Sequence, residues 1–357
     1  MSDKIRLCVM FGGQSPEHDI SCISATYVLN NLNTDKYKIT KIGITKKGEW
    51  YLYTGKNDNI INGSWKKDKK HLKKAIISPD TKDKGIILFE DDKIKKIKID
   101  VVFPVLHGEY GEDGTIQGLL ELAGLKYVGM GVCASANGMD KDFSKMVFKN
   151  ADIPQADWIT VHDYELHNMD EVINRAEIKL GYPCFVKPAS TGSSVGVGKA
   201  KNREELKSAL TNAVKFGRKI LIEEHIYGHE VECAVLGNKD VSASTVGEIL
   251  PDVEFYDFDA KYKSNTTKLQ IPADLDSDII EKIREYAIRA FRALDGSGLS
   301  RVDFFVRHSD KSVILNEINT MPGFTSISMY PKLWAAVGKS YTDLLDELIE
   351  LGLNHIK

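Results

Sequence analysis

The first half of the chain alternates between apolar runs and segments with the periodicity of amphipathic helices. Lys4 to Phe11 is a continuous apolar run that ends at Gly12-Gly13, and a helical pattern follows from Glu17 to about Leu32. Two further runs, Tyr37 to Ile44 and Ile99 to Leu106, have the composition of buried strands. A strand, a glycine turn and a helix in this order are typical of a doubly wound α/β domain.

From Met139 onward, short helical patterns alternate with strands and glycine-rich loops. The runs Cys184 to Pro188 and Lys219 to Ile226 predict further buried strands. One helical pattern of this half begins at Asp140. Four others cover Met169 to Lys179, Asn202 to Lys215, Ser277 to Leu294 and Ser340 to Leu351. Pro251 to Pro272 has no clear periodicity and is rich in aromatic residues. A loop of this length in a compact domain predicts a lid, over about Val253 to Leu269.

The stretch from Leu299 to Phe324 predicts a β-hairpin with a three-residue tip at Ser309 to Lys311. In that register four polar side chains share one face, Asp303 opposite Glu317 and Arg301 opposite Asn319. The other face is apolar and consists of Val302, Phe304, Val306, Ile314 and Ile318. The hairpin therefore holds carboxylates and a guanidinium at the rim of a hydrophobic core.

The composition is that of a globular protein without a strong charge bias. A length of 357 residues is enough for two or three domains, and a net charge of −3 does not attract nucleic acid or an anionic membrane. The lysine-rich segment Lys46 to Lys98 also contains acids, which is typical of a solvated surface. We see no signal peptide and no membrane-spanning run, and the five cysteines form no CxxC pair. We therefore expect a cytoplasmic protein with reduced thiols.

The carboxylates of the hairpin favour a metal ion. Asp303 and Glu317 repel each other, and their burial is costly unless a cation lies between them. Asp, Glu and Asn offer only oxygen ligands, which suits Mg²⁺ or Mn²⁺, and Mg²⁺ usually completes its shell with nucleotide phosphates. The alternative is a structural salt bridge in which Arg301 neutralises both acids.

A lysine inside an apolar strand indicates an anion nearby. Lys187 lies in such a strand and leads into the glycine- and serine-rich loop Ala189 to Gly198, whose N–H groups and hydroxyls suit phosphates. A flexible linker is the alternative. The Walker A pattern and the protein-kinase motifs are both missing from the sequence. Acids after the strand Lys219 to Ile226 would then face adenine and ribose.

Two glycine-rich turns follow strands of the first domain. His107 opens the turn that ends at Gly114, a place where α/β folds contact ligands, although a hydrogen-bonded loop histidine is an open alternative. Glu112 fits the next helix's first turn, where it would complement the helix dipole. The Gly12-Gly13 turn offers N–H groups to a small anion but lacks the G-x-G-x-x-G spacing, which disfavours an NAD enzyme.

Taken together, motifs along nearly the whole chain resemble those of the D-alanine-D-alanine ligases of the ATP-grasp superfamily. The motifs are Gly12-Gly13-x-Ser-x-Glu17 with Ser21, His107-Gly-x-x-Gly-Glu-Asp-Gly114, Lys187 with Ser193-Ser194, Phe255-Tyr-Asp-x-x-Ala-Lys-Tyr262, and Arg301-x-Asp303 with Glu317-x-Asn319-Thr-x-Pro-Gly323. The resemblance implies an α/β fold with a Rossmann-like N-terminal domain over residues 1–138 and a two-part ATP-grasp fold. The central subdomain would cover 139–228 and the C-terminal subdomain 229–357.

The resemblance also implies roles for single residues. The ligands of two Mg²⁺ or Mn²⁺ ions would be Asp303, Glu317 and Asn319. ATP would be contacted by Lys141 and Lys187 at the phosphates, Glu223 at the adenine amino group, Glu230 at the ribose, and by Ser194, Glu224, Ile226 and Lys261. The substrates would be held by Glu17 at the first ammonium group, His107 near the reacting carboxylate, Arg301 and the Gly323 amide at the oxyanion, and Ser328 and Met329. Ser193 and Tyr262 would latch the lid to Glu17.

The implied activity is the ATP-dependent joining of two D-alanine molecules through an acyl phosphate, for peptidoglycan synthesis, by a homodimer. A D-alanine-D-serine or D-alanine-D-lactate ligase of the vancomycin-resistance type is an alternative, and a non-catalytic nucleotide-binding regulator is a more distant one. The retained Tyr262 and the apolar Met329 favour D-alanine as the acceptor, and an intact Lys187 argues against a regulator. The chain departs from many relatives at His18, where they have arginine beside Glu17.

Overall fold

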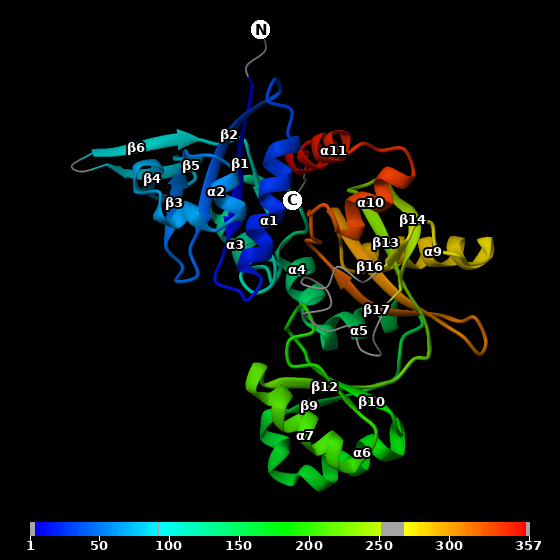
Figure 1. Ribbon diagram of the computed structural model, residues 1–357. Coiled ribbons are helices and arrows are strands. Elements are labelled where there is room, and N and C mark those ends of the chain that lie inside the picture. The colour runs from blue at the N-terminus through cyan, green and yellow to red at the C-terminus, as the bar shows by residue number, and fades with distance from the viewer. Residues whose placement is uncertain (1–3, 91–92, 251–267, 355–357) are drawn as a thin grey trace.

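The computed structural model of the chain describes residues 4–90, 93–250 and 268–354, and its strands form three sheets (Figure 1). The N-terminal sheet has eight strands, the next sheet four and the C-terminal sheet five. The predicted α/β organisation is confirmed. The predicted lid, with Lys261 and Tyr262, falls almost entirely within 251–267, outside the described residues.

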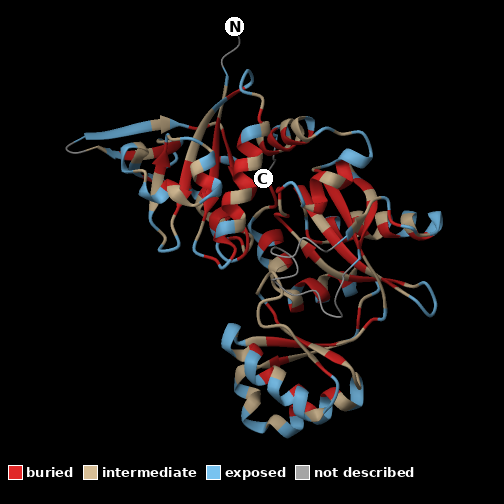
Figure 2. Cartoon of the chain, in the orientation of Figure 1, coloured by how far each residue is buried: buried red, intermediate tan, exposed pale blue. Residues whose placement is uncertain are grey.

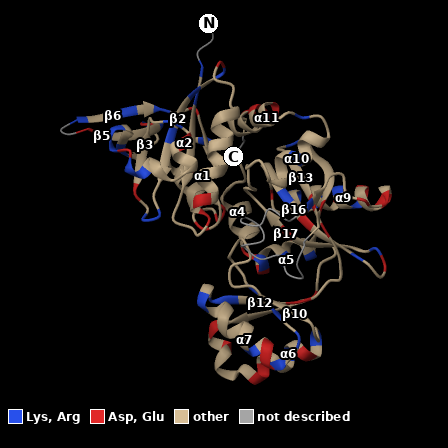
Figure 3. Ribbon diagram, in the orientation of Figure 1, with Lys and Arg blue, Asp and Glu red and all other residues tan. Residues whose placement is uncertain are grey.

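The N-terminal sheet combines a parallel half with an antiparallel extension, in the order β6-β5-β4-β3-β2-β1-β7-β8. The parallel strands are β1 (Ile5–Gly12), β2 (Tyr37–Ile44), β7 (Val101–Pro104) and β8 (Lys126–Tyr127). The extension consists of β3 (Trp50–Tyr53), β4 (Leu72–Ile77), β5 (Gly85–Glu90) and β6 (Lys93–Lys98). The helices of this part are α1 (His18–Asn31), α2 (Asp58–Ile61) and α3 (Thr115–Leu122), with short 3-10 turns η1 (Ser64–Lys67) and η2 (Lys69–His71). The exposed β6 carries four lysines (Figure 3).

The four-stranded sheet carries the strand with Lys187. Its antiparallel order is β11-β10-β12-β9. The strands are β9 (Trp158–His162), β10 (Cys184–Pro188), β11 (Gly198–Ala200) and β12 (Lys219–Glu224), and the helices are η3 (Asp163–Asn168), α6 (Met169–Lys179), α7 (Arg203–Ala213) and η4 (Val214–Phe216). The predicted bounds of β10 and α6 are confirmed. This sheet and its helices have a separate hydrophobic core.

The C-terminal sheet contains a hairpin that the sequence pattern did not reveal. Its strands are β13 (Gly228–Gly237), β14 (Val241–Leu250), β15 (Lys268–Gln270), β16 (Gly298–Arg307) and β17 (Val313–Asn319). The helices that follow β8 or pack on this sheet are α4 (Val132–Met139), α5 (Lys141–Asn150), α9 (Ser277–Ala293), α10 (Met329–Ala336) and α11 (Tyr341–Leu353). β13 is buried along most of its length, so it lacks the alternation of a half-exposed strand. β15 also lies within the stretch that we expected to be irregular.

The predicted register of the β16–β17 hairpin is right at the polar end. Asp303 pairs with Glu317 and Arg301 with Asn319. The tip, however, has four residues, because the Arg307 amide donates to the Ser312 carbonyl. A one-residue bulge beyond Asp303 then restores the register.

The bulge overturns one part of the predicted apolar face. Ile314 pairs with Phe305 and lies in a cluster with Ala156 and Ile226. Val302 and Phe304 lie in a different cluster, on the opposite face of the hairpin. Residues three apart in a regular strand lie on opposite faces, but the extra residue of the bulge puts Ile314 and Glu317 on the same face. Ile314 therefore packs on the polar side of the sheet.

The N-terminal and C-terminal sheets share one hydrophobic core, which Figure 2 shows as buried residues on both sides of their junction. Phe324, just after β17, is fully buried in it. Its ring packs edge-to-face on Phe103 of β7, with 5.6 Å between the centroids, and the Tyr341 hydroxyl of α11 donates to its carbonyl. The end of the hairpin is thus anchored to the first domain.

We predict that Phe324→Ala lowers the free energy of unfolding by about 3–5 kcal/mol, because it leaves a cavity at this junction. Phe89→Ala is the matched control, since Phe89 is 45% exposed, and it should change stability by no more than about 0.5 kcal/mol. Urea unfolding of both variants measures the difference. Equal losses would show that Phe324 does not hold the junction together.

Candidate active site

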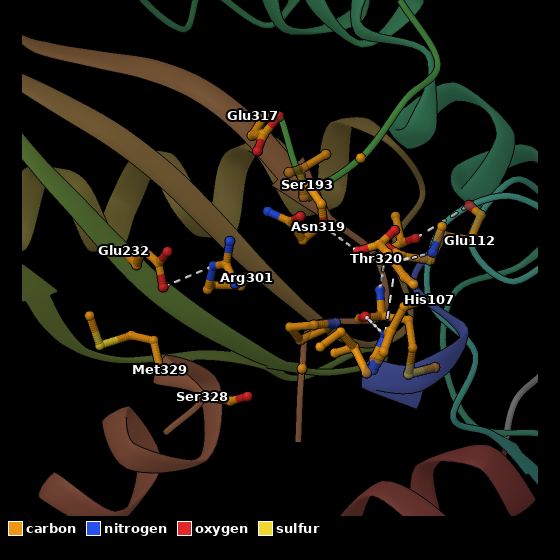
Figure 4. A pocket seen from close by; sticks show the side chains of 18 of the residues that line it. His107, Glu112, Ser193, Glu232, Arg301, Glu317, Asn319, Thr320, Ser328 and Met329 are labelled. Atoms are coloured by element: carbon orange, nitrogen blue, oxygen red, sulfur yellow. Dashed lines mark hydrogen bonds and ion pairs between the residues drawn. The ribbon is translucent and has the colours of Figure 1, made fainter. Parts of the chain in front are cut away.

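Three parts of the chain meet at one cavity of about 360 Å³ (Figure 4). The N-terminal domain contributes Glu17 and His107, the glycine- and serine-rich loop contributes Ser193, and the C-terminal sheet contributes Arg301 and Glu317. The structure therefore brings these five residues together at one cavity.

Glu17 lines the cavity at a place where glycines leave room for its carboxylate. A Cβ at Gly108 would lie 2.4 Å from Oε2, and one at Gly192 would lie 3.0 Å from it. The Ser193 hydroxyl donates to Oε1, which is the contact that the predicted latch requires. Ser193 itself has a φ of 50°, a strained conformation for a residue other than glycine.

His18, the residue that differs from many relatives, puts no positive charge beside Glu17. Burial lowers the pKa of His18, so the ring is neutral. Its Nδ1 lies 2.6 Å from the Gly13 carbonyl. The expectation of an anion site at Gly12-Gly13 is wrong, because the Gly12 amide donates to Ser21 Oγ and the Gly13 amide to the Ile44 carbonyl.

His107 joins the N-terminal domain to the segment after β17. Its Nδ1 lies 3.0 Å from the Met321 carbonyl and therefore carries the proton, since a carbonyl only accepts. Nε2 then accepts from the Ser24 hydroxyl at 2.9 Å, and Ser24 Oγ accepts from the Phe324 amide. Burial lowers the pKa of His107, in keeping with a neutral ring.

Glu112 also connects the two domains, a position that the sequence did not indicate. Oε1 accepts from the Gly108 amide at 3.0 Å and Oε2 from the Met321 amide at 3.3 Å. Burial and the nearby negative charge of Glu17 raise the pKa of Glu112 to about 8. Its expected role at the helix dipole is wrong, because the carboxyl group turns into the protein.

Three carboxylates form a row across neighbouring strands. Glu232 of β13 pairs with Asp303 of β16, which pairs with Glu317 of β17. Arg301 lies between the first two: it makes two hydrogen bonds of 2.7 Å to Asp303, and its Nε lies 2.9 Å from Glu232 Oε2. Figure 4 shows Glu232 and Arg301 turned toward each other. Burial alone would lower the pKa of Arg301, but the two acids raise it well above its ordinary value.

The rest of the hairpin's polar face is also paired. The Asn319 amide donates to Asp303 Oδ2 at 3.0 Å, and Lys141 Nζ lies 3.6 Å from Glu317 Oε2. The salt bridge that we considered as an alternative is thus present between Arg301 and Asp303, whereas the cation beside Glu317 is Lys141. Among the described residues, no three His, Cys, Asp or Glu side chains gather as metal ligands do; the predicted set contains two acids and one amide.

A second cavity, of about 510 Å³, lies between the four-stranded and C-terminal sheets. Its lining includes most of the predicted nucleotide contacts: Lys141, Lys187, Ser194, Glu223, Glu224, Ile226 and Glu230. Lys187 Nζ lies 2.6 Å from Glu223 Oε2, and Lys145 Nζ lies 3.3 Å from Oε1. Burial would raise the pKa of Glu223, but the two lysines lower it to about 2.

Comparison with known proteins identifies the family. Residues 6–130 match the model described as D-ala D-ala ligase N-terminus, and residues 147–350 match the model of its C-terminus. The chain belongs to the D-alanine-D-alanine ligase family. It is 54% identical to D-alanine--D-alanine ligase of Acetivibrio thermocellus, over 99% of this chain and 97% of the relative, and 52% identical to that of Thermoanaerobacter sp., over 98% and 97%.

Solved structures of the same fold agree. The VanG D-Ala:D-Ser ligase of Enterococcus faecalis is 39% identical, with a TM-score of 0.90, over 98% of this chain and all of that one. The D-alanine-D-alanine ligase of Coxiella burnetii is 36% identical, with a TM-score of 0.84, over 99% and 95%. The ATP-grasp fold expected from the sequence is confirmed.

Within this member of the family, the remaining predicted residues lie along the C-terminal side of the first cavity. Gly323, Ser328 and Met329 all line it. The Ser328 hydroxyl accepts from the Thr325 amide at 3.0 Å, and a Cβ at Gly323 would lie 2.7 Å from it. In the described part of the chain, no helix has the length and apolar character that a membrane crossing needs.

Sequence reasoning missed the roles of three residues: Glu112, Glu232 and Lys145. Glu232 follows Glu230 by two residues, and acids that alternate within an apolar strand would have indicated a shared face. Lys145 follows Lys141 by one helical turn, which places both on one side of α5. Glu112 gave no such signal.

We predict that Glu112→Gln gains stability relative to the wild-type protein as the pH rises from about 5 to about 8. In the folded wild-type protein the pKa of Glu112 is about 8, so the carboxyl group keeps its proton up to that pH. In the unfolded chain it loses the proton near the ordinary glutamate pKa of about 4.3. Its stability therefore falls across this window, while glutamine does not titrate. Urea unfolding of both proteins at several pH values tests this, and a pH-independent difference would contradict it.

Proposed function

We propose that this protein uses ATP to join two D-alanine molecules through an acyl-phosphate intermediate. The observation that carries the proposal is that the two cavities meet, since Lys141, Ser193 and Glu317 line both. A phosphoryl group moves from a nucleotide to a small acid only if the two are bound within reach of each other. Relatives named D-alanine--D-alanine ligase, about half identical over nearly the whole chain, support the same reading.

The first D-alanine would bind at the N-terminal end of the cavity. Glu17 is a buried carboxylate there and would pair with the ammonium group. The neutral His107 ring and neutral Glu112 add no charge that would compete for it. The carboxylate of this D-alanine would point toward Lys141 and the nucleotide cavity, where its phosphorylation takes place.

The nucleotide would lie in the second cavity, with its phosphates at the junction. Lys187, Lys141 and the loop with Ser193-Ser194 offer positive charge and donors to the phosphates. Glu223, which pairs with Lys187, would contact adenine together with Glu224 and Ile226, and Glu230 would contact the ribose. ATP-grasp membership implies the use of ATP, and these contacts are our proposal for how it is held.

The polar end of the hairpin fits divalent cations. Asp303 and Glu317 face each other, and Asn319 lies on the same face two residues beyond Glu317. This donor set of two carboxylates and an amide oxygen suits two Mg²⁺ or Mn²⁺ ions. When bound, such ions neutralise the phosphate oxygens of the reacting group. Asp303 would then share its charge between the ions and Arg301.

The second step forms the peptide bond. The neutral amine of the second D-alanine attacks the acyl phosphate, and the carbonyl oxygen gains negative charge. As the intermediate collapses, the bond between carbon and the phosphate oxygen breaks, and the proton lost by the amine leaves with the phosphate. Arg301, held by Glu232 and Asp303, and the Gly323 amide line the same cavity and would act as fixed donors to this oxygen. Their orientation is set before the reaction, so they stabilise the charge as it develops.

The acceptor would lie against Ser328 and Met329. Met329 is buried and gives this end of the cavity an apolar wall. Such a wall suits a methyl group and leaves the hydroxyl of D-serine without a partner. The VanG D-Ala:D-Ser ligase has the same fold at 39% identity, so D-serine remains the second candidate.

We also propose a cytoplasmic location, in keeping with five free cysteines. The domain boundaries and the homodimer stay predictions.

We predict that Glu317→Gln reduces turnover at least about 100-fold, or about 2.7 kcal/mol in activation free energy. A neutral amide at the junction of the cavities cannot balance the cations that would gather there. Phosphate release with D-alanine and Mg-ATP measures the effect. Glu281→Gln is the control, since Glu281 is an exposed acid paired with Arg284. Normal turnover of a folded Glu317→Gln protein would remove the hairpin from the mechanism.

We predict that D-alanine is the preferred acceptor, D-serine a poor one and D-lactate negligible near neutral pH. The cost of burying the D-serine hydroxyl unpaired, about 1–3 kcal/mol, sets a preference of about five- to 150-fold. Competition among equal concentrations of the three acceptors, with products resolved by mass spectrometry, measures it. A majority of D-alanyl-D-serine or of the depsipeptide would assign the protein to the resistance-type ligases.

A further inference from the structure

Lys145 is a fully buried lysine that lines neither cavity. It lies on α5, between the C-terminal and four-stranded sheets in Figure 1, and it is 2% exposed. Its Nζ is 3.3 Å from Glu223 Oε1, donates to the Ala156 carbonyl at 3.4 Å, and lies 5.1 Å from the centre of the Trp158 ring. A buried ammonium group is unfavourable without a counter-ion, and Glu223 provides one for Lys145.

Glu223 has a second lysine on its other oxygen. Lys187 Nζ lies 2.6 Å from Oε2 and 3.3 Å from Asn316 Oδ1. Unlike Lys145, Lys187 lines the nucleotide cavity, together with Glu223 itself. The two lysines therefore contact one carboxylate from two sides, and only Lys187 is in reach of a ligand in that cavity.

The arrangement gives Glu223 one cation more than its charge requires. If Lys187 turns toward phosphate oxygens, the carboxylate loses its shortest ion pair while it stays buried. A carboxylate left alone in such a place is strongly unfavourable and takes up a proton or draws the lysine back. Lys145 prevents this, since its position behind the cavity does not depend on the ligand.

We infer that Lys145 is a positioning residue for nucleotide binding: it is the permanent counter-ion of Glu223 and holds that carboxylate in place while Lys187 exchanges Glu223 for the phosphates. The inference rests on the proposed function only in taking the ligand to be an adenine nucleotide. It concerns the base end of the cavity, and it does not depend on which amino acids are joined.

The test is a double-mutant cycle on ADP affinity, measured by calorimetry with Mg²⁺ and without amino acids. Lys145→Met should weaken ADP binding at least about tenfold, because Lys187 then stays with Glu223. In a Glu223→Gln background the same change should weaken binding less than about twofold, since a neutral amide needs no counter-ion. Lys149→Met is the matched control: Lys149 lies one turn further along α5 over the same Trp158 ring, at 6.0 Å.

Equal losses in the two backgrounds, or an equal loss in Lys149→Met, would overturn the inference, since either shows that Lys145 acts only through the fold. Lys145→Gln, which keeps a polar group for Glu223, serves as a second variant if Lys145→Met does not fold; it should show the same dependence on Glu223. ADP binding needs no ligation, so a wild-type protein that binds ADP but makes no dipeptide would contradict the proposed function and leave this test intact.

Discussion

The repulsion among three carboxylates in one row is the constraint on which the rest of the site depends. Glu232, Asp303 and Glu317 occupy neighbouring positions on β13, β16 and β17, and the first two are almost fully buried. Such a row is unfavourable in a medium of low polarity unless cations compensate it. Arg301 lies between two of the acids and Lys141 approaches the third. The register of the hairpin, including its bulge, is what keeps these charges in contact.

The same principle holds at the base end of the nucleotide cavity, with the signs reversed. There one buried carboxylate, Glu223, lies between Lys145 and Lys187. In both places a cation of the protein is paired with an acid at the position where ligand charges would enter. The salt-bridge and metal interpretations of the hairpin are therefore compatible, because Arg301 balances the charge of Asp303 when no metal ion is bound. Under the proposed function, ligand binding would be an exchange of partners, which is less costly than exposing an unpaired charge.

The sequence predicted those elements whose pattern lies within one short stretch of the chain, and it did not predict features that depend on contacts between distant residues. The bounds of β2, β10 and α6 followed from uninterrupted apolar runs and helical periodicity. β13 did not, because a strand buried on both faces has no alternation to read. The hairpin register came out right through two compensating features, a longer tip and a bulge, that no pattern revealed, and Ile314 consequently lies on the face opposite to the predicted one. Glu112 acquires its role only through contact with Met321, more than 200 residues away in the sequence.

That long-range contact bears on what His107 can do. Its Nδ1–H is held by the Met321 carbonyl and its Nε2 by the Ser24 hydroxyl, so both ring nitrogens are occupied and the ring is neutral. A histidine in this state can take a proton from the attacking amine only if Nε2 gives up the hydrogen bond from Ser24, whose Oγ in turn accepts from the Phe324 amide. What it does instead is fix the backbone from Met321 to Phe324, which carries the Gly323 amide. We propose that His107 contributes to the reaction in this way, by fixing the Gly323 amide as a prearranged donor for the developing oxyanion where the N-terminal and C-terminal domains pack together.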